Sequence, residues 1–301
     1  MDTKHKTNGT LLIILAGIFW GSMGIFVRSL ADLAGFTSIQ IVSLRLTVAA
    51  VTFTLILLRK DRKGFRIAPK DIPLFLGLGL GSVLFFAACY FTAIQMMTLS
   101  VAAILLYTSP IWVMLMSLLF FREKMTRYKM LALVISFLGC VLVSGIGSGE
   151  NNVTVIGMLI GLGSGIGYGL YSILGTVALR KYSTYTVTTY TFIIAATGSV
   201  FLCSLPDLLH KITACPRKPH LCVLIILTGL VTAVIPFLCY TLGLEQVEAS
   251  RAAILATIEP MVATLLGVVV FHEYLTVMSI IGIVCIIAAI VLLNLRFSRP
   301  D

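Results

Sequence analysis

The stretch Ser100-Val-Ala-Ala-Ile-Leu105 returns with a single change as Ser250-Arg-Ala-Ala-Ile-Leu255, 150 positions further along the chain. The same spacing carries the match outward in both directions. It pairs Cys89-Tyr90 with Cys239-Tyr240, Pro110 with Pro260, and Phe121, Glu123 and Thr126 with Phe271, Glu273 and Thr276. A register that persists through proline, glutamate and threonine is not expected from a chance likeness of apolar segments. The sequence is therefore predicted to hold two copies of one unit.

Both copies consist mainly of apolar residues. Hydrophobic residues make up 59% of the 301 residues and charged residues only 11%, with a mean hydropathy of +1.06. A soluble protein carries about 25% charged residues, so this chain lacks the polar side chains to cover a water-facing surface. Lipid must be its main solvent. A large catalytic domain outside the membrane is thereby excluded, and nucleic acid is not expected as a partner despite the net charge of +10.

Ten segments have the length and composition of membrane-spanning helices, each of which needs about 20 apolar residues. The predicted fold is an all-α polytopic membrane protein of ten transmembrane helices, built as two inverted five-helix repeats over residues 10–146 and 153–294. The connections are short, and the longest are 59–71 and 206–220. The predicted segments are 10–29, 37–58, 72–93, 98–121, 128–146, 153–175, 184–205, 221–243, 250–271 and 276–294.

Lysine and arginine mark one side of these segments. With the N-terminus in the cytoplasm, 17 basic residues fall on the inner side and four on the outer side, and cytoplasmic loops are the ones that carry such an excess. Both termini are therefore predicted to be cytoplasmic, in a plasma membrane. The inner residues are Lys4, Lys6, Arg59, Lys60, Arg62, Lys63, Arg66, Lys70, Arg122, Lys124, Arg127, Lys129, Arg180, Lys181, Arg251, Arg296 and Arg299; the outer ones are Arg28, Lys211, Arg217 and Lys218.

Five segments per copy is an odd number, so the two copies must enter the membrane from opposite sides. The charges agree with this inversion. Arg122, Lys124, Arg127 and Lys129 of the first copy become His272, Tyr274, Val277 and Ser279 in the second, where the connection would face outward. An inverted-topology repeat is common in secondary transporters, which alternate access around a central site.

Several short motifs are similar to those of a known family. They are Ala16-Gly-Ile-Phe-Trp-Gly21, Ser43-Leu-Arg45, Ala102-Ala103 through Pro110, Phe121-Arg-Glu123, Ala252-Ala253 through Glu259-Pro260, and Phe271-His-Glu273. In this order and spacing the chain resembles the EamA-type carriers of the drug/metabolite transporter superfamily over about residues 10–294. Tyr168 departs from the pattern, because many members carry tryptophan there. The resemblance implies a carrier of a small metabolite, often an exporter of amino acids or related compounds.

Two charged residues lie well inside predicted spans, where charge is costly and therefore a functional candidate. Arg45 is eight residues into the second segment and Glu259 nine residues into the ninth. At about 1.5 Å per residue, both lie roughly 12–16 Å from the predicted outer face. Three readings stay open: a structural ion pair, a substrate or coupling role, and the wall of a wet cavity.

Pro110 and Pro260 interrupt the fourth and ninth segments at equivalent points. A proline inside a helix frees a backbone carbonyl and bends the helix. In a membrane this is tolerated where the freed group finds a partner or lines a cavity. The resemblance places segments three, four, eight and nine around the central pathway. It thereby implies substrate-binding roles for Tyr90, Gln95, Tyr107, Trp112, Tyr240 and Glu259, and Trp20, Tyr168 and Tyr171 of segments one and six join them by their predicted depth.

Glycines in segment six recur every four residues, at Gly157, Gly161, Gly165 and Gly169. This spacing makes a smooth stripe that lets another helix approach closely. Gly17 and Gly21 form a matching face in segment one. The run fits no phosphate-binding pattern and lies inside an apolar span, so helix packing is the favoured interpretation.

The sequence predicts no enzyme and no cofactor. All four histidines lie in tails or connections, no nucleotide-binding loop exists, and no metal site is predicted. Cys215 and Cys222 flank a loop and leave a disulfide open, because spacing alone does not fix the geometry.

The predicted function is gradient-driven transport of a small organic metabolite by alternating access, with an amino acid or related-metabolite exporter as the leading form. The partners would be a small-molecule substrate, the lipid bilayer and a coupling proton or cation. An importer in the same fold, a channel or scaffold without alternating access, and a lipid-modifying membrane enzyme are the alternatives.

Overall fold

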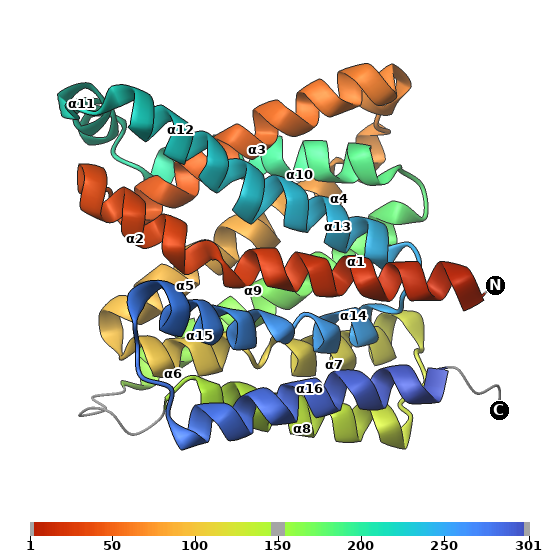
Figure 1. Ribbon diagram of the computed structural model, residues 1–301. Helices are drawn as coiled ribbons and strands as arrows, with labels where there is room; N and C mark the ends of the chain where they lie inside the picture. Colours follow the sequence, from red (N-terminus) through yellow and green to blue (C-terminus); the bar gives the residue numbers. More distant parts are fainter. Residues whose placement is uncertain (1–2, 146–153, 298–301) are drawn as a thin grey trace.

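The computed structural model describes residues 3–145 and 154–297, and in these ranges the chain is a bundle of helices (Figure 1). The predicted segment ends at 146 and 153 lie outside the described residues. The first half contains α1 Thr3–Gly21, α2 Met23–Ala34, α3 Ser38–Lys60, η1 Arg62–Phe65, η2 Pro69–Asp71, α4 Ile72–Leu76, η3 Gly77–Leu84, α5 Phe85–Met96, α6 Leu99–Leu106, α7 Ser109–Phe121 and α8 Arg127–Val143. The second half contains α9 Val155–Leu179, α10 Thr184–Leu202, α11 Leu205–Ala214, α12 Lys218–Gly229, η4 Leu230–Val234, α13 Ile235–Leu244, α14 Ala249–Leu255, α15 Ile258–Phe271 and α16 Val277–Phe297.

Among the described residues, nine continuous helical stretches are long and apolar enough to cross a membrane. They correspond to nine of the ten segments expected from the sequence. The remaining segment, predicted at 128–146, forms α8, which has 17 described residues and packs along α16. The prediction of an all-helical, multi-pass membrane protein is confirmed.

The two halves share the same irregularities, which is strong evidence for a duplicated unit. A π-helical turn interrupts the third span at η3 and the eighth span at η4. The fourth and ninth spans break between α6 and α7 and between α14 and α15. Each of these spans then ends in a left-handed residue, Arg122 with φ of 53° and His272 with φ of 55°. Equivalent backbone deviations at a spacing of 150 confirm the two repeats.

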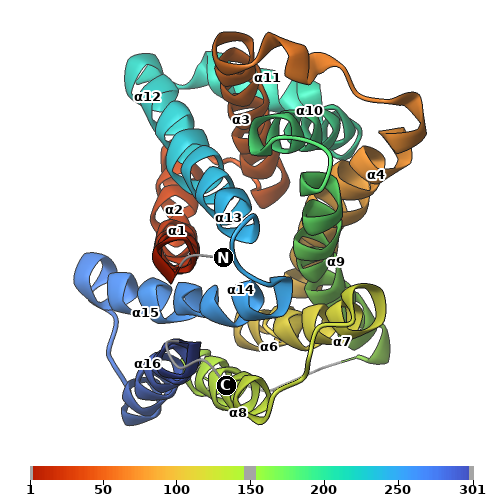
Figure 2. The ribbon, with the colours of Figure 1, turned by 90° about the vertical axis from the view of Figure 1, so that its right-hand side faces the viewer.

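The halves interlock rather than lie side by side. Helix α1 of the first half packs along α13, α14 and α15 of the second, and α9 packs along α5, α6 and α7 of the first (Figures 1 and 2). Small residues permit this approach. A methyl group on Gly165 would lie 2.8 Å from the Leu105 carbonyl oxygen, and one on Gly139 of α8 would lie 2.8 Å from the Gly282 carbonyl oxygen of α16.

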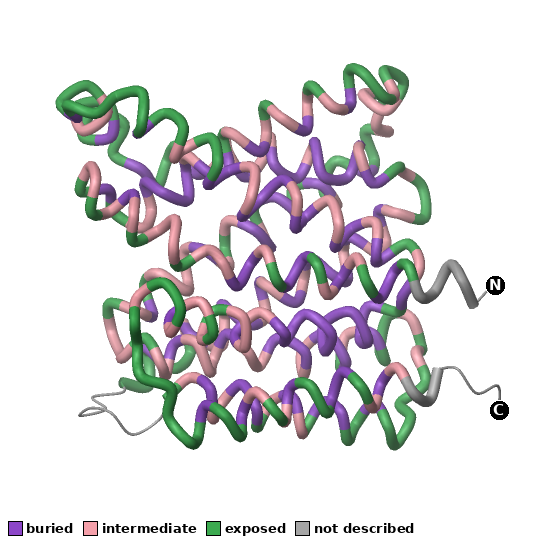
Figure 3. The backbone as a smooth tube through the Cα atoms, in the orientation of Figure 1, coloured by how far each residue is buried: buried purple, intermediate pink, exposed green. Residues whose placement is uncertain are grey.

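Burial follows from this interlocking. Buried residues concentrate where helices of both halves meet, and exposed residues follow the outer surfaces of the peripheral helices (Figure 3). Many of the exposed side chains are large and apolar, such as Phe201 and Leu119, which are 86% and 74% exposed. In water this surface would be unfavourable, and it is what a bilayer-embedded bundle needs.

The connections gather at the two ends of the bundle as the basic residues predict. The start of α1, the end of α16, η1 and the α7–α8 connection lie at one end (Figure 1). Helix α11 and the α15–α16 connection lie at the opposite end (Figure 1). The loops that the sequence groups together by charge are therefore grouped together in space.

The longest connection of the second half differs from the expectation of an irregular loop. Residues 205–214 form α11, whose Asp207 accepts a hydrogen bond from Gln40 Nε2 (2.6 Å) and pairs with Lys211 (2.9 Å). The Lys211 ammonium, together with Gln40, holds the pKa of the Asp207 carboxyl below its usual range. Nearby, Cys215 is buried and Cys222 exposed, and both are free thiols in this structure.

Candidate functional site

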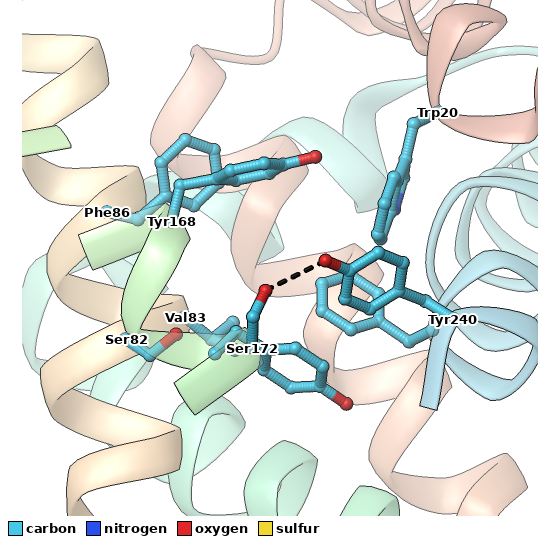
Figure 4. Close-up of a pocket in the computed structure, with 9 residues that line it drawn as sticks. Trp20, Ser82, Val83, Phe86, Tyr168, Ser172 and Tyr240 are labelled. Atoms are coloured by element: carbon cyan, nitrogen blue, oxygen red, sulfur yellow. Dashed lines mark hydrogen bonds between the residues drawn. The ribbon is translucent and has the colours of Figure 1, made fainter. Parts of the chain in front are cut away.

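A pocket lies between helices of the two halves (Figure 4). Its walls come from α1, η3, α5, α9 and α13, so both repeats contribute, and the first repeat does so partly through its π-helical turn η3. The lining residues are Trp20, Ser82, Val83, Phe86, Tyr168, Tyr171, Ser172, Phe237 and Tyr240.

Aromatic rings form most of the pocket wall. The Trp20 ring centroid lies 5.2 Å from the centroids of both Phe237 and Tyr240, and 5.9 Å from that of Tyr168. Phe86 meets Tyr168 edge-on at 5.3 Å, on the same side of the close-up (Figure 4). Tilted and edge-on rings at these distances attract one another and resist rearrangement. The pocket therefore presents a stiff, mainly apolar surface with a few polar groups.

The tyrosine hydroxyls are held by polar partners. Tyr240 Oη lies 2.8 Å from Ser172 Oγ, the contact dashed in Figure 4. Tyr171 Oη lies 2.7 Å from Thr241 Oγ1 on the neighbouring helix. These contacts join α9 to α13 and satisfy hydroxyls that would otherwise be costly to bury.

The third tyrosine bonds to the acid that the sequence singled out. Tyr168 Oη donates to Glu259 Oε2 at 2.9 Å. The Tyr168 ring lines the pocket while its hydroxyl reaches α15, so the pocket and the carboxylate are one hydrogen bond apart. Glu259 is thus in direct contact with a phenol from segment six.

The break in the ninth span explains the position of Glu259. Pro260 has no N–H to give to the carbonyl of Ala256, four residues earlier, and the Glu259 amide bonds to that oxygen instead at 3.0 Å. Thr257 Oγ1 caps the preceding turn through the Ile254 carbonyl at 2.7 Å. The carboxylate consequently stands in the first turn of α15, where the helix dipole favours negative charge.

The first repeat has the same break with different chemistry. Thr108 Oγ1 donates to the Leu105 carbonyl at 2.6 Å, and Trp112 Nε1 donates to Thr108 Oγ1 at 3.1 Å. Tyr107 stands at the break itself, just after α6. Ser109 is the residue before Pro110 and is buried, so this break carries a hydroxyl where the other carries a carboxylate.

Arg45 and Glu259 do not touch in this structure. Arg45 is buried on α3, its Nη1 is in close contact with the Met23 thioether, and no salt bridge joins it to Glu259. Of the readings that the sequence leaves open, a direct ion pair is the one that this arrangement does not contain.

The remaining predicted residues occupy different positions. Trp20, Tyr168, Tyr171 and Tyr240 line the pocket. Tyr90 does not line the pocket but stacks on Phe86, which does, with ring centroids 6.0 Å apart. Tyr107 and Trp112 flank the helix break, and Gln95 is exposed near the end of α5.

Five pocket residues escaped the sequence analysis. Helical spacing gives a signal for three of them, since Phe86 precedes Tyr90 by four residues, Ser172 follows Tyr168 by four, and Phe237 precedes Tyr240 by three. Residues at these spacings share a helix face. Ser82 and Val83 carry no such signal because they lie in the π-helical turn η3, which shifts the face that each residue presents.

Metal ligands are scarce in this region. In the described ranges, no three His, Cys, Asp or Glu side chains come close enough together to hold a metal ion. The polar chemistry of the pocket rests on hydroxyls and on one carboxylate, which suit hydrogen bonding and charge recognition.

The fold and the pocket define a multi-pass membrane protein made of two interlocked repeats with an aromatic pocket between them. The chain belongs to the EamA-like transporter family, whose model matches residues 7–145 and 155–295. It is thereby a member of the drug/metabolite transporter superfamily and a membrane transporter.

Individual relatives agree over nearly the whole chain. Two proteins of Archaeoglobus fulgidus, each called an uncharacterized transporter, are 27% and 28% identical to it and are covered over 93% and 95% of their lengths, with 90% and 94% of this chain. Uncharacterized transporter YvbV of Bacillus subtilis is 24% identical, with 98% of this chain and 94% of that protein covered. A crystal structure with 18% identity superposes with a TM-score of 0.80 over 98% of this chain and 99% of the other, which supports the fold.

Proposed function

We propose that this protein is a gradient-driven secondary transporter that exports an amino acid or a related small metabolite by alternating access. The observation that carries the proposal is the Tyr168–Glu259 hydrogen bond, which links an aromatic pocket to a carboxylate at a helix break. Broken helices around a site between inverted repeats are what alternating-access carriers use. Export is the favoured direction because of the resemblance described above.

The pocket supports a small amphipathic solute. Its aromatic wall can take an apolar group of the solute, and the hydroxyls of Tyr168, Ser172 and Tyr240 can bind polar groups. Within this proposal Trp20, Tyr168, Tyr171 and Tyr240 bind the solute.

Glu259 is the proposed coupling residue. It is the acidic side chain of the pocket region, and its present partner is a neutral phenol rather than a cation. A carboxylate in this position can accept a proton or hold a cation in one access state and release it in the other. The hydrogen bond from Tyr168 would then couple the charge of Glu259 to the pocket that the Tyr168 ring lines.

Counterflow in liposomes tests the function directly. A thermal-shift screen first chooses an amino acid that binds the purified protein. Vesicles that contain the protein are then loaded with an excess of this amino acid in unlabelled form and diluted into a buffer with a trace of the labelled form. A carrier accumulates label transiently above equilibrium, and empty vesicles do not. Label that equilibrates without an overshoot indicates a channel and contradicts alternating access.

The orientation needs its own measurement. We propose a plasma-membrane protein with cytoplasmic termini, on the basis of 17 inner and four outer basic residues. Lys63→Cys and Lys218→Cys are introduced singly into a cysteine-free background, and intact cells are treated with an impermeant maleimide. We expect labelling at position 218 and protection at position 63, and the reverse pattern contradicts the proposal.

A further inference from the structure

Ser82 brings an unpaired hydroxyl to the pocket wall. The residue lines the pocket and is only 1% exposed, and its oxygen points from η3 toward the other lining residues (Figure 4). Its hydroxyl has no hydrogen-bond partner among the residues that the structure describes. The other hydroxyls of the lining already have partners, in the pairs Ser172–Tyr240, Tyr171–Thr241 and Tyr168–Glu259.

The second repeat shows what the same position does without a pocket. A buried serine or threonine in a helix often turns its hydroxyl back to the carbonyl four residues earlier. Thr232 lies 150 positions after Ser82, in the π-helical turn η4, and its Oγ1 donates to the Thr228 carbonyl at 2.6 Å. Ser82, in the π-helical turn η3, makes no such bond to Leu78. One turn therefore satisfies its own hydroxyl, and the other presents it to the pocket, as π-turns at functional sites do.

The turn that carries Ser82 is held from outside the pocket. A methyl group on Gly79 would lie 2.6 Å from Ile194 Cγ2 and 3.0 Å from the Thr191 carbonyl oxygen, so η3 is pressed against α10. A methyl group on Gly167 of α9 would lie 3.0 Å from the Phe86 backbone nitrogen, directly after η3. The Ser82 hydroxyl is therefore presented at a fixed position, and a group that is already in place binds without the entropic cost of ordering it.

The rest of the lining determines what can meet this hydroxyl. None of the nine lining residues carries a charge, and six of them are aromatic. The part of a solute that fills the pocket is therefore expected to be an uncharged ring. A bare ring would cover the Ser82 hydroxyl and leave it buried without a partner, which is costly. A ring with its own hydroxyl can pair with Ser82 and avoid this cost.

We propose that Ser82 is a specificity residue that hydrogen-bonds a neutral polar group on the ring of the transported solute, so that the carrier prefers a phenolic ring to a bare phenyl ring. This inference rests on the proposed function, in which the pocket binds the solute. It names the chemical group that the pocket takes, whichever charge the rest of the solute carries.

Matched probes isolate the ring hydroxyl. Tyramine is compared with phenethylamine, 3-(4-hydroxyphenyl)propanoate with 3-phenylpropanoate, and L-tyrosine with L-phenylalanine. The 3-hydroxyphenyl isomers are measured beside them, so that two ring positions are sampled. The three pairs differ in their charged end, and the result therefore does not depend on which charged end the carrier accepts. Titration calorimetry on the purified full-length protein in detergent gives the ratio of dissociation constants within each pair.

The ratio should depend on Ser82 and not on its repeat equivalent. The wild type should bind one hydroxylated isomer about 3- to 10-fold more tightly than the bare ring, the size expected for a neutral hydrogen bond. Ser82→Ala should bring the two within about 1.5-fold, chiefly by weakening the hydroxylated probe. Thr232→Val removes a hydroxyl that its own helix satisfies, and it should keep the wild-type ratio. Together the probes and variants form a double-mutant cycle, which isolates the contact between the two hydroxyls.

The stability of the variant separates specificity from structure. Ser82→Ala loses no hydrogen bond within the protein, so it should melt as the wild type does in the absence of solute. If it does not fold, Ser82→Cys keeps a weak hydrogen-bonding group and should give an intermediate ratio.

Three results would overturn the assignment: no probe binds, the wild type shows no preference, or Ser82→Ala keeps the wild-type preference. Counterflow separates this inference from the function on which it rests. Binding with the expected ratios but no counterflow supports the role of Ser82 and contradicts transport. Counterflow without any ring preference supports transport and contradicts the role of Ser82.

Discussion

Two helix crossings hold the repeats together. Their backbone geometry is alike, but the side chains at the two crossings differ in chemistry. At one crossing α1 approaches α15, where a methyl group on Gly21 would lie 2.7 Å from the Glu259 carbonyl oxygen. At the other α9 approaches α7, where a methyl group on Gly169 would lie 3.3 Å from the Ser109 carbonyl oxygen. In both cases the glycine faces the residue before a proline. Both copies have the same packing, and one copy alone carries the acid.

The aromatic residues at the two crossings also differ in the contacts that they make. Trp20 of α1 and Tyr168 of α9 occupy equivalent places one residue before these glycines. Tyr168 reaches across to Glu259, whereas Trp20 packs on Phe237 and Tyr240. The acid of one crossing is therefore bonded to the tyrosine of the other. A change at Glu259 should affect both crossings, and a change at Ser109 only one.

The largest effect is expected from Glu259→Gln, compared with Ser109→Ala at the equivalent position. We expect Glu259→Gln to reduce transport at least about 100-fold, the equivalent of roughly 2.7 kcal/mol, because the carboxylate charge is lost while the side-chain volume is kept. Ser109→Ala should stay within about twofold. Initial rates in liposomes and melting temperatures in detergent are measured for both.

The alternative for Glu259 is a structural charge balance with Arg45. In that case Glu259→Gln melts early, and the double substitution with Arg45→Gln recovers both stability and transport. Normal transport by Glu259→Gln at every pH would end the coupling proposal. In either outcome Glu259 would have no coupling role, and the two crossings would differ in packing but not in transport function.

The sequence predicts the fold well because the fold rests on repeated, one-dimensional signals. The duplicated prolines and the apolar segments determine which helices form and where they break, and the structure confirms both. The helix α11 was missed because ten residues with one proline and mixed polarity look like a connection. Its contacts with distant parts of the chain, such as the hydrogen bond from Gln40 to Asp207 and the burial of Leu208 beside Leu30 and Phe36, are invisible in the local sequence.

The candidate site is harder to predict because it depends on which way each residue faces. Charge and aromatic character mark Glu259 and Trp20 in an apolar span, whereas Val83 and Phe237 look like any lipid-facing residue. The π-helical turn η3 also shifts the helix face at Ser82. Gln95 shows the opposite error. It was predicted to bind substrate, but its polar side chain lies near the end of a span and is exposed.

The largest effect on stability, as distinct from transport, concerns the ends of the two broken helices. Glu123 follows α7 and is 12% exposed; Lys129, 7% exposed, lies 3.6 Å from it and 2.6 Å from Glu248 of the second half. Ser250 donates to Glu123 as well. Lys129→Met should destabilise the protein by about 3–5 kcal/mol, because it leaves a buried carboxylate uncompensated. Thermal melting measures this effect, and Lys129→Met with Glu123→Gln should recover much of it. A single variant that melts like the wild type would show that water reaches this end.

The third effect comes from the glycines at the crossings. Gly21→Ala places a methyl group 2.7 Å from both the Glu259 oxygen and Val262 Cβ, which are fixed by the backbone. Gly169→Ala meets Val113 Cγ2 at 2.9 Å, a side-chain atom that can move. We expect about 2–3 kcal/mol of destabilisation at Gly21 and about 1 kcal/mol at Gly169. Melting curves of the two variants, measured together, check the order. Equal losses of stability in the two variants would mean that both crossings tolerate an added methyl group to the same degree.

The smallest effect is expected at the Glu273 end, where the repeat equivalent of Glu123 meets Arg28. The N–H groups of Glu123 and Glu273 bond to equivalent carbonyls at 3.3 and 3.2 Å, so the two carboxylates are presented by the same backbone turn. Their partners differ in exposure, because Arg28 and Glu273 are 52% and 49% exposed at a distance of 2.7 Å. Arg28 also lies over the Phe271 ring, 4.2 Å from its centroid.

Exposure should make this contact weak. A solvent-exposed ion pair contributes about 0.2–1 kcal/mol and is screened by salt, so Arg28→Met should lower the melting temperature slightly and less still at high salt. Melting at low and high ionic strength, beside Lys129→Met, measures the difference between the ends. If Arg28→Met is as damaging as Lys129→Met, the two ends are held equally. If it is not, the Glu273 end needs less energy to separate, and an alternating-access cycle would open there more readily than at the Glu123 end.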